Sequence, residues 1–325
     1  MVAWRVKKFW VGILAAALAG GAVAATNEVV SATNRSAVAT AQSKQEIEEE
    51  FHKLMELDDA AQAEVDGWIR ENQDFAAKGA GVSPLQMRQR IRARLEPVGK
   101  AYEDFIKRHP GHVQARVAYA SFLGDVQGEE KAEEQLEAAL ALDTNNPSIY
   151  NNLANIYGHI GENKKAFEYY EKAMKLNPLE SIYYHNLGTS VYLFRKDAEE
   201  YYHLDEPQVF AKAFGLYSNA MRLDPENFPL ASEVAQSWYG QRPLHVEEAL
   251  RAWTNALSLA HDEIEREGVY LHFARVKLLS GRFREAQAHL NSVTNEMYAD
   301  LKAKLAHNLA EREKEFNATN HVKVK

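Results

Sequence analysis

The sequence predicts an all-α fold in which helical hairpins repeat along the chain and stack into an α-solenoid. The first observation is a spaced triple, Ala then a bulky residue then Ala or Val, that occurs five times with internal spacings of four and three. Its leading alanines are 34, 47, 36 and 37 residues apart, at positions 132, 166, 213, 249 and 286. Repetition at this period is typical of stacked helical arrays. The second observation is that Pro and Gly are scarce, at 9 and 17 of 325 residues, which leaves room for long helices.

The N-terminus has the order of a secretory signal peptide, predicted over residues 1–24. Basic residues come first, then an apolar run at residues 9–25, and small residues end the segment at Ala22-Val23-Ala24. The run is short and rich in Ala and Gly, whereas a spanning helix needs about 20 apolar residues. Two alternatives stay open: a cleaved signal, or an uncleaved anchor that attaches the chain to a membrane. Either one exports the chain, and we expect it in the periplasm or associated with the cell envelope.

Two helices are predicted to precede the repeats. Residues 25–45 are rich in Ser, Thr, Ala and Asn and are predicted to form a disordered linker. Residues 46–110 are predicted to form a helical hairpin or degenerate repeat around KGAGVSP, with Ser83 as N-cap and Pro84 at the first helical position. The apolar stripe of its first helix is expected to comprise Ile47, Phe51, Leu54 and Leu57.

Each repeat is expected to contain two antiparallel helices. The first helix has a large residue followed directly by a small one, as in Leu153-Ala154 and Leu187-Gly188, and the small residue allows the second helix to approach closely. The Ala-bulky-Ala triple forms an apolar stripe on the second helix. The residues expected to form this structural signature are Tyr150, Leu153, Ala154, Ala166, Tyr170, Ala173, Pro178, Leu187, Gly188, Ala213, Tyr217, Ala220, Ala249, Trp253, Ala256 and Ala286.

Turn and stop residues set the limits of five copies. Glycines 128, 161 and 281 lie near turns between helices, where a positive φ favours Gly, and Pro178 and Pro225 follow second helices and end them. A single hairpin cannot bury its own apolar stripe, so neighbours must stack on it. Residues 301–325 are predicted to form a capping helix and tail. The copies are predicted at 113–146, 147–180, 181–227, 228–266 and 267–300.

Residues 147–178 resemble the tetratricopeptide repeat, a helix-turn-helix of 34 residues, nearly position for position. The aromatic, Leu, Gly or Ala, Tyr, Ala, aromatic, Ala and Pro positions are all filled, and the flanking copies match less fully. The resemblance implies a right-handed superhelix whose concave surface binds a protein or peptide. It is a statement about scaffold use and not about chemistry.

The resemblance further implies that first helices line the concave face. Side-chain amides there can pair with both the N–H and C=O groups of an extended peptide, although a merely solvated polar face is the alternative. Some members of the family hold a C-terminal carboxylate with two Asn and several basic residues. Here Asn151, Pro229 and Glu233 occupy the cation positions, so recognition of a free C-terminus is not expected. The predicted partner-binding residues are Asn151, Asn152, Asn155, His185, Asn186, Thr189, Tyr192 and Gln236.

The third copy is 13 residues longer than the second, and the excess lies at residues 194–207 between its two helices. Insertions in repeat arrays gather on one face and are often functional. The insertion holds Tyr201, Tyr202 and His203 together, which are candidate contact residues. The alternative is a loop that covers an exposed edge between repeats.

Several classes of function are disfavoured by composition and motifs. The chain has no Cys, which excludes disulfides and thiolate chemistry, and its net charge of −8 disfavours nucleic acid as a partner. Metalloprotease, hydrolase and phosphate-loop motifs are absent from the sequence. His109 and His112 supply only two ligands, so neither a metal nor a cofactor is expected. The sequence predicts a non-enzymatic, exported protein-interaction scaffold, with a membrane-anchored envelope assembly factor as the alternative and an enzyme or enzyme subunit as a weaker third.

Overall fold

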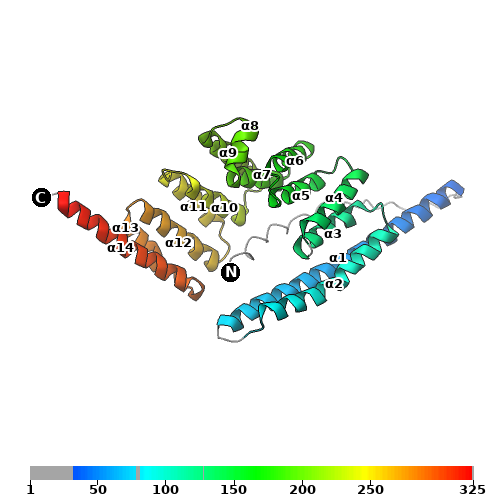
Figure 1. The fold of residues 1–325 in the computed structure, drawn as a ribbon, viewed down its shortest axis with the longest axis horizontal. Coiled ribbons are helices and arrows are strands. Elements are labelled where there is room, and N and C mark those ends of the chain that lie inside the picture. Colours follow the sequence, from blue (N-terminus) through cyan, green and yellow to red (C-terminus); the bar gives the residue numbers. More distant parts are fainter. Residues whose placement is uncertain (1–31, 78–80, 127, 324–325) are drawn as a thin grey trace, which may run out of the picture. The chain divides into compact units, whose positions relative to one another are not determined.

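The computed structural model describes residues 32–77, 81–126 and 128–323, and all regular structure in these segments is helical (Figure 1). They fall into two compact units, with the boundary between Gly161 and Glu162. The first contains α1 (Ala32–Ala77), α2 (Pro84–Arg108), α3 (Val113–Val126), α4 (Glu129–Leu142) and α5 (Pro147–His159). The second contains α6 (Asn163–Leu176), α7 (Ser181–Leu193), α8 (Arg195–Tyr202), α9 (Glu206–Leu223), α10 (Phe228–Ser237), η1 (Trp238–Gly240), α11 (Val246–Leu259), α12 (Glu263–Leu279), α13 (Phe283–Asn291), η2 (Glu296–Tyr298) and α14 (Ala299–Lys323).

The predicted N-terminal hairpin is formed by α1 and α2, which pack against each other in the first unit. Ser83 is the N-cap of α2 and Pro84 its first residue, as the sequence predicted. The backbone N–H of Gln86 donates to Ser83 Oγ at 3.3 Å, and the side chain of Gln86 accepts from the backbone N–H of Ser83 at 3.0 Å. This capping box satisfies two N–H groups that would otherwise lack partners at the start of the helix.

Helix α1 begins earlier than the sequence indicated. It starts at Ala32, so the predicted disordered linker is wrong from residue 32 to residue 45. The physical reason is that this stretch is rich in Ala and contains neither Gly nor Pro, so no residue interrupts the helix before Gln45. The predicted signal segment at 1–24, and the part of the linker at 25–31, lie outside the described residues.

The buried stripe of α1 runs through Asp58 instead of Leu57. Leu57 is 41% exposed and Asp58 only 8%, because the stripe continues from Leu54 with a step of four residues. Burial raises the pKa of the Asp58 carboxyl, and this effect is opposed by hydrogen bonds from Tyr102 and Gln62. The Tyr102 hydroxyl donates to Asp58 Oδ2 at 2.7 Å, so the first unit buries a polar pair between its first two helices.

The leading alanines occupy equivalent places in their helices. Ala132, Ala166, Ala249 and Ala286 are each the fourth residue of a second helix, and none is more than 1% exposed. The backbone N–H of Ala166 donates to Glu162 O at 3.0 Å, and that of Ala286 donates to Arg282 O at the same distance. In the longer α9 the equivalent Ala213 is also fully buried. The predicted apolar stripe is therefore confirmed as core.

The predicted turn residues are also confirmed. Gly128, Gly161 and Gly281 have φ angles of +101°, +87° and +75°, in the region that favours glycine. Pro178 and Pro225 each stand two residues beyond the end of a second helix, α6 and α9. The hairpins are thus delimited by residues that the sequence pattern had marked.

The close approach of two helices explains why the first helix of the third copy, α7, has a glycine at its small-residue position. Gly188 on α7 faces α9, and a Cβ atom built at this position would lie 3.0 Å from two ring atoms of Tyr217 and 3.3 Å from Leu216 Cβ. Such distances are shorter than a normal carbon–carbon contact. Glycine fits at position 188 because the Tyr217 ring occupies the space that a side chain would need.

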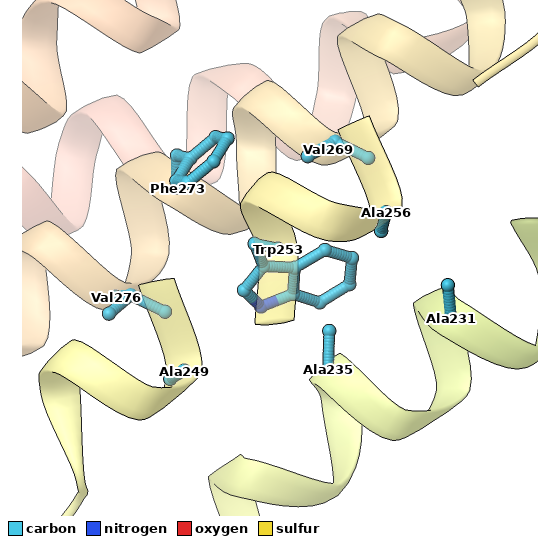
Figure 2. Close-up of a cluster of buried hydrophobic side chains, with 8 residues drawn as sticks. All are labelled: Ala231, Ala235, Ala249, Trp253, Ala256, Val269, Phe273 and Val276. Carbon is cyan, nitrogen blue, oxygen red and sulfur yellow. The ribbon is translucent and has the colours of Figure 1, made fainter. Parts of the chain in front are cut away.

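The core of the second unit extends across neighbouring repeats. Figure 2 shows the indole of Trp253, on α11, between the alanines of α10 and the apolar side chains of α12. A further cluster joins α12, α13 and α14 through Leu271, Leu290 and Leu309. The C-terminal helix therefore covers the last hairpin, as expected of a cap. Within the described segments, no helix has the combination of length and apolar character needed to cross a bilayer.

Two predicted limits need correction in the last copies. Asp262 caps α12, with its side chain accepting from the N–H of Glu265, so the first helix of the fifth copy starts about one turn before the predicted limit at 267, while the repeat register is unchanged. The C-terminal helix begins at Ala299 instead of 301. Asp262 is an intrinsically good N-cap, and this local preference decides the start of the helix.

Replacing Gly188 by Ala is expected to destabilise the chain by about 1–3 kcal/mol, because the added methyl group overlaps the Tyr217 ring. The matched control is Gly215→Ala, at an exposed position of α9, where no atom outside the helix backbone lies within 4 Å of the new Cβ. That control is expected to be neutral or stabilising by up to about 1 kcal/mol. Urea unfolding measures both, and equal effects of the two variants would contradict the proposed helix contact.

Candidate protein-binding surface

Three first helices lie side by side in the second unit. α7 reaches α10 through His185 Nε2 and Glu233 Oε2, which are 3.0 Å apart. α10 continues into η1, whose Tyr239 hydroxyl donates to the carbonyl oxygen of His272 on α12 at 3.3 Å. We call the surface formed by α7, α10–η1 and α12 the first-helix face. It exists because consecutive hairpins stack in register, which places equivalent helices next to one another.

A closed polar cluster occupies the α7–α10 part of this face. Thr189 Oγ1 donates to Glu233 Oε1 at 2.6 Å, and the Tyr217 hydroxyl donates to Thr189 Oγ1 at 3.2 Å. Burial raises the pKa of Glu233, but hydrogen bonds from His185 and Thr189 outweigh it and hold the pKa below its ordinary value. Two predicted partner-binding residues, His185 and Thr189, are thus joined to each other through Glu233. They hold α7 against α10.

The other predicted residues of the second unit differ in exposure. Gln236 is exposed on α10, and Asn186 is half-buried. Tyr192 is half-buried, and its ring lies beneath the Arg195 guanidinium, 5.4 Å from the ring centroid. A Cβ atom at Gly240 would overlap the Tyr192 hydroxyl, so a larger residue where η1 passes α7 would displace the Tyr192 ring. Gln236 is the member of this set most accessible to a partner.

The asparagines predicted on the second copy lie in the first unit. Asn151 and Asn152 are only 3% and 8% exposed, and Asn151 Nδ2 donates to Asn152 Oδ1 at 3.4 Å. Asn155 is half-buried on the same helix, α5. Their role in binding a partner stays a prediction, and Asn155 is the most exposed of the three.

The insertion forms helix α8, which covers α6. Asn163 Nδ2 donates to Asp197 Oδ2 at 2.8 Å, and Lys164 Nζ donates to Glu200 Oε2 at 2.6 Å. The rings of Tyr201 and Tyr202 each lie 5.6 Å from the Phe167 ring. His203 is exposed and ends α8 with a φ of +54°. These contacts favour the alternative in which the insertion protects a helix edge.

The two histidines of HPGH have distinct structural roles. His109 is the C-cap residue of α2, and its Nε2 lies 3.2 Å from Glu50 Oε2. His112 stands before α3, where its Nδ1 accepts from the backbone N–H of Ala115 at 3.1 Å. Burial lowers the pKa of His112. The described residues contain no group of three or more His, Asp or Glu side chains arranged to hold a metal ion.

An arginine-lined pocket was missed from the sequence. Its volume is about 440 Å³, and it is lined by Tyr239, Arg242, Leu244, Arg275, Leu279 and Arg312. We call it the arginine pocket. Arg275 is eight residues after position 267, as Asn155, Thr189 and Gln236 are after positions 147, 181 and 228. Applying the same repeat position to the fifth copy would therefore have identified Arg275 as a candidate binding residue from the sequence.

Aromatic contacts hold Tyr239 and Arg275, two residues that line this pocket. His272 stacks on Trp253 with ring centroids 3.9 Å apart and an interplanar angle of 11°. Tyr239 lies beside His272, and the Arg275 guanidinium is 4.6 Å from the centroid of the Tyr239 ring. Burial lowers the pKa of His272 to about 4, and the positive charge of Arg275 acts in the same direction.

The free energy of unfolding is expected to decrease as the pH is lowered from about 6.5 to about 4. The reason is that His272 of the unfolded chain binds a proton at a higher pH than His272 of the folded chain does. The contribution is fully present above pH 6.5 and is lost as the pH approaches 4. His272→Phe keeps a stacked ring but cannot titrate, so its unfolding free energy should vary less with pH in this window. Exposed His307→Phe on α14 is the control, and an unchanged slope in His272→Phe would contradict the assignment.

Comparison with known proteins agrees with this architecture. Residues 147–178 match the family model described as tetratricopeptide repeat. A stretch of 93 residues, 28% of this chain, is 32% identical to Photosystem I assembly protein Ycf3 of Acaryochloris marina (strain MBIC 11017). The match covers 52% of that protein, so the chain spans about half the length of this curated relative.

Two solved structures are similar to this chain at low sequence identity. PilW, described as a widely conserved type IV pilus biogenesis factor, is 15% identical with a TM-score of 0.51, covering 74% of this chain and 97% of that one. YrrB, described as a TPR protein with an unusual peptide-binding site, is 16% identical with a TM-score of 0.47, covering 64% and 98%. The repeat match at residues 147–178 and the all-α hairpin architecture together show that this chain has the all-α fold of a tetratricopeptide-repeat solenoid.

Proposed function

We propose that this chain is a non-enzymatic interaction scaffold that binds a segment of a partner polypeptide on its first-helix face. The observation that carries the proposal is the side-by-side packing of α7, α10–η1 and α12, which presents side chains at equivalent repeat positions along one surface. A pocket opens on this face between Tyr239, Arg275 and Leu279. Concave sites with apolar walls and a few polar groups are typical of binding sites.

The chemistry of the face favours a polypeptide. Exposed Gln236 offers both a donor and an acceptor to a peptide backbone, and Arg275 adds charged donors. The net charge of −8 disfavours nucleic acid. The partly related Photosystem I assembly protein has an assembly role in its name, which supports a scaffold over a catalyst. An enzyme or enzyme subunit has less support, since no catalytic motif occurs in the sequence.

Export to the periplasm or cell envelope is part of the proposal and rests on the order of basic, apolar and small residues at 1–24. A membrane-anchored envelope assembly factor is the alternative, in which the apolar run at 9–25 is retained. N-terminal sequencing of the exported chain distinguishes them. A chain that starts at Ala25 supports cleavage, and an intact N-terminus in the membrane fraction supports the anchor.

Photocrosslinking from the full chain tests the binding face. A photoreactive residue at Gln236, exposed on α10, is expected to crosslink a polypeptide of discrete mass. The matched position is Thr254, exposed on the second helix α11, which should give at least about tenfold less product because it is outside the first-helix face.

Mass spectrometry identifies what is captured in this experiment. Equal crosslinking from both positions, or none from Gln236, would contradict the proposed surface. A small metabolite that copurifies with the chain, without any captured polypeptide, would favour the enzyme alternative.

A further inference from the structure

We infer that the arginine pocket binds an acidic segment of a partner polypeptide, through the side-chain carboxylates of that segment. This inference rests on the proposed function and names the chemistry of the partner at one end of the first-helix face. The three arginines come from separate elements: Arg242 from the loop after η1, Arg275 from α12 and Arg312 from α14. Helices α12 and α14 pack against each other in the second unit (Figure 1).

The structure holds two of these side chains in place without neutralising them. Arg242 Nη1 donates to Tyr239 O at 2.7 Å and to Gln241 O at 2.8 Å. The Arg275 guanidinium is stacked over the Tyr239 ring. Both contacts leave donor groups of the guanidinium available, because a guanidinium carries five N–H donors. Holding these side chains in advance reduces the entropy lost when a ligand binds.

No ion pair neutralises the positive charge of the three arginines within the described part of the chain. Ion pairs with glutamates are instead formed by Arg94, Arg108, Arg195, Arg251, Arg266 and Arg282. Three like charges that line one pocket repel each other, and an anion bound between them removes that repulsion. The pocket is thus complementary to negative charge although the chain as a whole is acidic.

The size and walls of the pocket indicate a peptide segment instead of a single small anion. An adjoining pocket of about 460 Å³ shares Arg275, Leu279 and Arg312 with it. Leu244 and Leu279 provide apolar surface in the arginine pocket, and Leu278 and Leu305 provide it in the adjoining one. A segment that alternates acidic and apolar side chains would satisfy both, since guanidinium groups pair with carboxylates in a bidentate manner.

The charge of the lining residues changes from the arginine pocket to the adjoining pocket. Glu311 and Glu315 line it together with Asn308, whereas no carboxylate lines the arginine pocket. Acidic side chains of the partner are therefore placed at Arg242, and uncharged or basic ones toward Glu315. This polarity disfavours a ligand that is negatively charged along its whole length.

Fluorescence anisotropy with labelled peptides and the full chain tests the inference. The probe is a peptide that alternates Glu and Leu and ends in a C-terminal amide, and the comparison peptide has Gln in place of Glu. The Glu peptide is expected to bind with an affinity that falls as salt is added, and the Gln peptide at least about tenfold more weakly.

Charge-matched variants assign the binding to this pocket. R242Q/R275Q/R312Q is expected to weaken binding of the Glu peptide at least about tenfold. The control R88Q/R222Q/R284Q removes the same charge from exposed arginines that do not line the pocket, and should change the affinity less than about twofold. Circular dichroism and Tm confirm that both variants are folded before affinities are compared.

Three outcomes would overturn the inference: no binding of the Glu peptide, equal loss in both triple variants, or binding only by a peptide with a free C-terminal carboxylate or a phosphoserine. Photocrosslinking from Gln236 separates this failure from failure of the proposed function. A polypeptide captured equally by the wild type and by R242Q/R275Q/R312Q would leave the scaffold proposal intact and remove the acidic segment from it.

Discussion

The burial of apolar side chains between consecutive hairpins is the constraint on which the second unit depends. Trp253 is fully buried, yet the residues around it belong to three helices and two repeats. Neither α10 with α11 nor α12 with α13 could bury this ring alone. Burying a large aromatic side chain contributes a few kcal/mol, which is a substantial part of the net stability of a domain. The alanines at positions 249 and 256 keep the helices close enough for that contact.

The same packing creates the surface to which we assign function. Because the hairpins stack in register, α7, α10–η1 and α12 are neighbours, and their polar contacts, such as His185 with Glu233, hold them at fixed spacing. The arginine pocket lies where this face meets the C-terminal helix, so the proposed binding site is built from residues 70 positions apart, Arg242 and Arg312. The pocket is therefore formed by residues from several stacked elements, and no single repeat contains all of them.

The sequence predicted those features that depend on local spacing. Ala166 belongs to a triple whose internal spacings of four and three recur in every copy, and the burial of its members follows from that spacing. Ser83 and Asp262 show the limit: both cap helices, but only the first was recognised, because Pro84 marked it. The arginine pocket was missed because its charges are scattered along the chain and converge only in three dimensions. The burial of His185 was missed for a similar reason, since its partner Glu233 is on another helix.

Hydrogen exchange on the full chain carrying Trp253→Phe tests the shared core most directly. Shrinking this ring should leave a cavity that all three surrounding helices line, so amides of α10, α11 and α12 are predicted to exchange faster together. The exposed neighbour Thr254→Ala, whose hydroxyl bonds only within α11 at Leu250 O, should leave them unchanged. Faster exchange confined to α11, with α10 and α12 unaffected, would show that the hairpins are stable independently and would contradict the account.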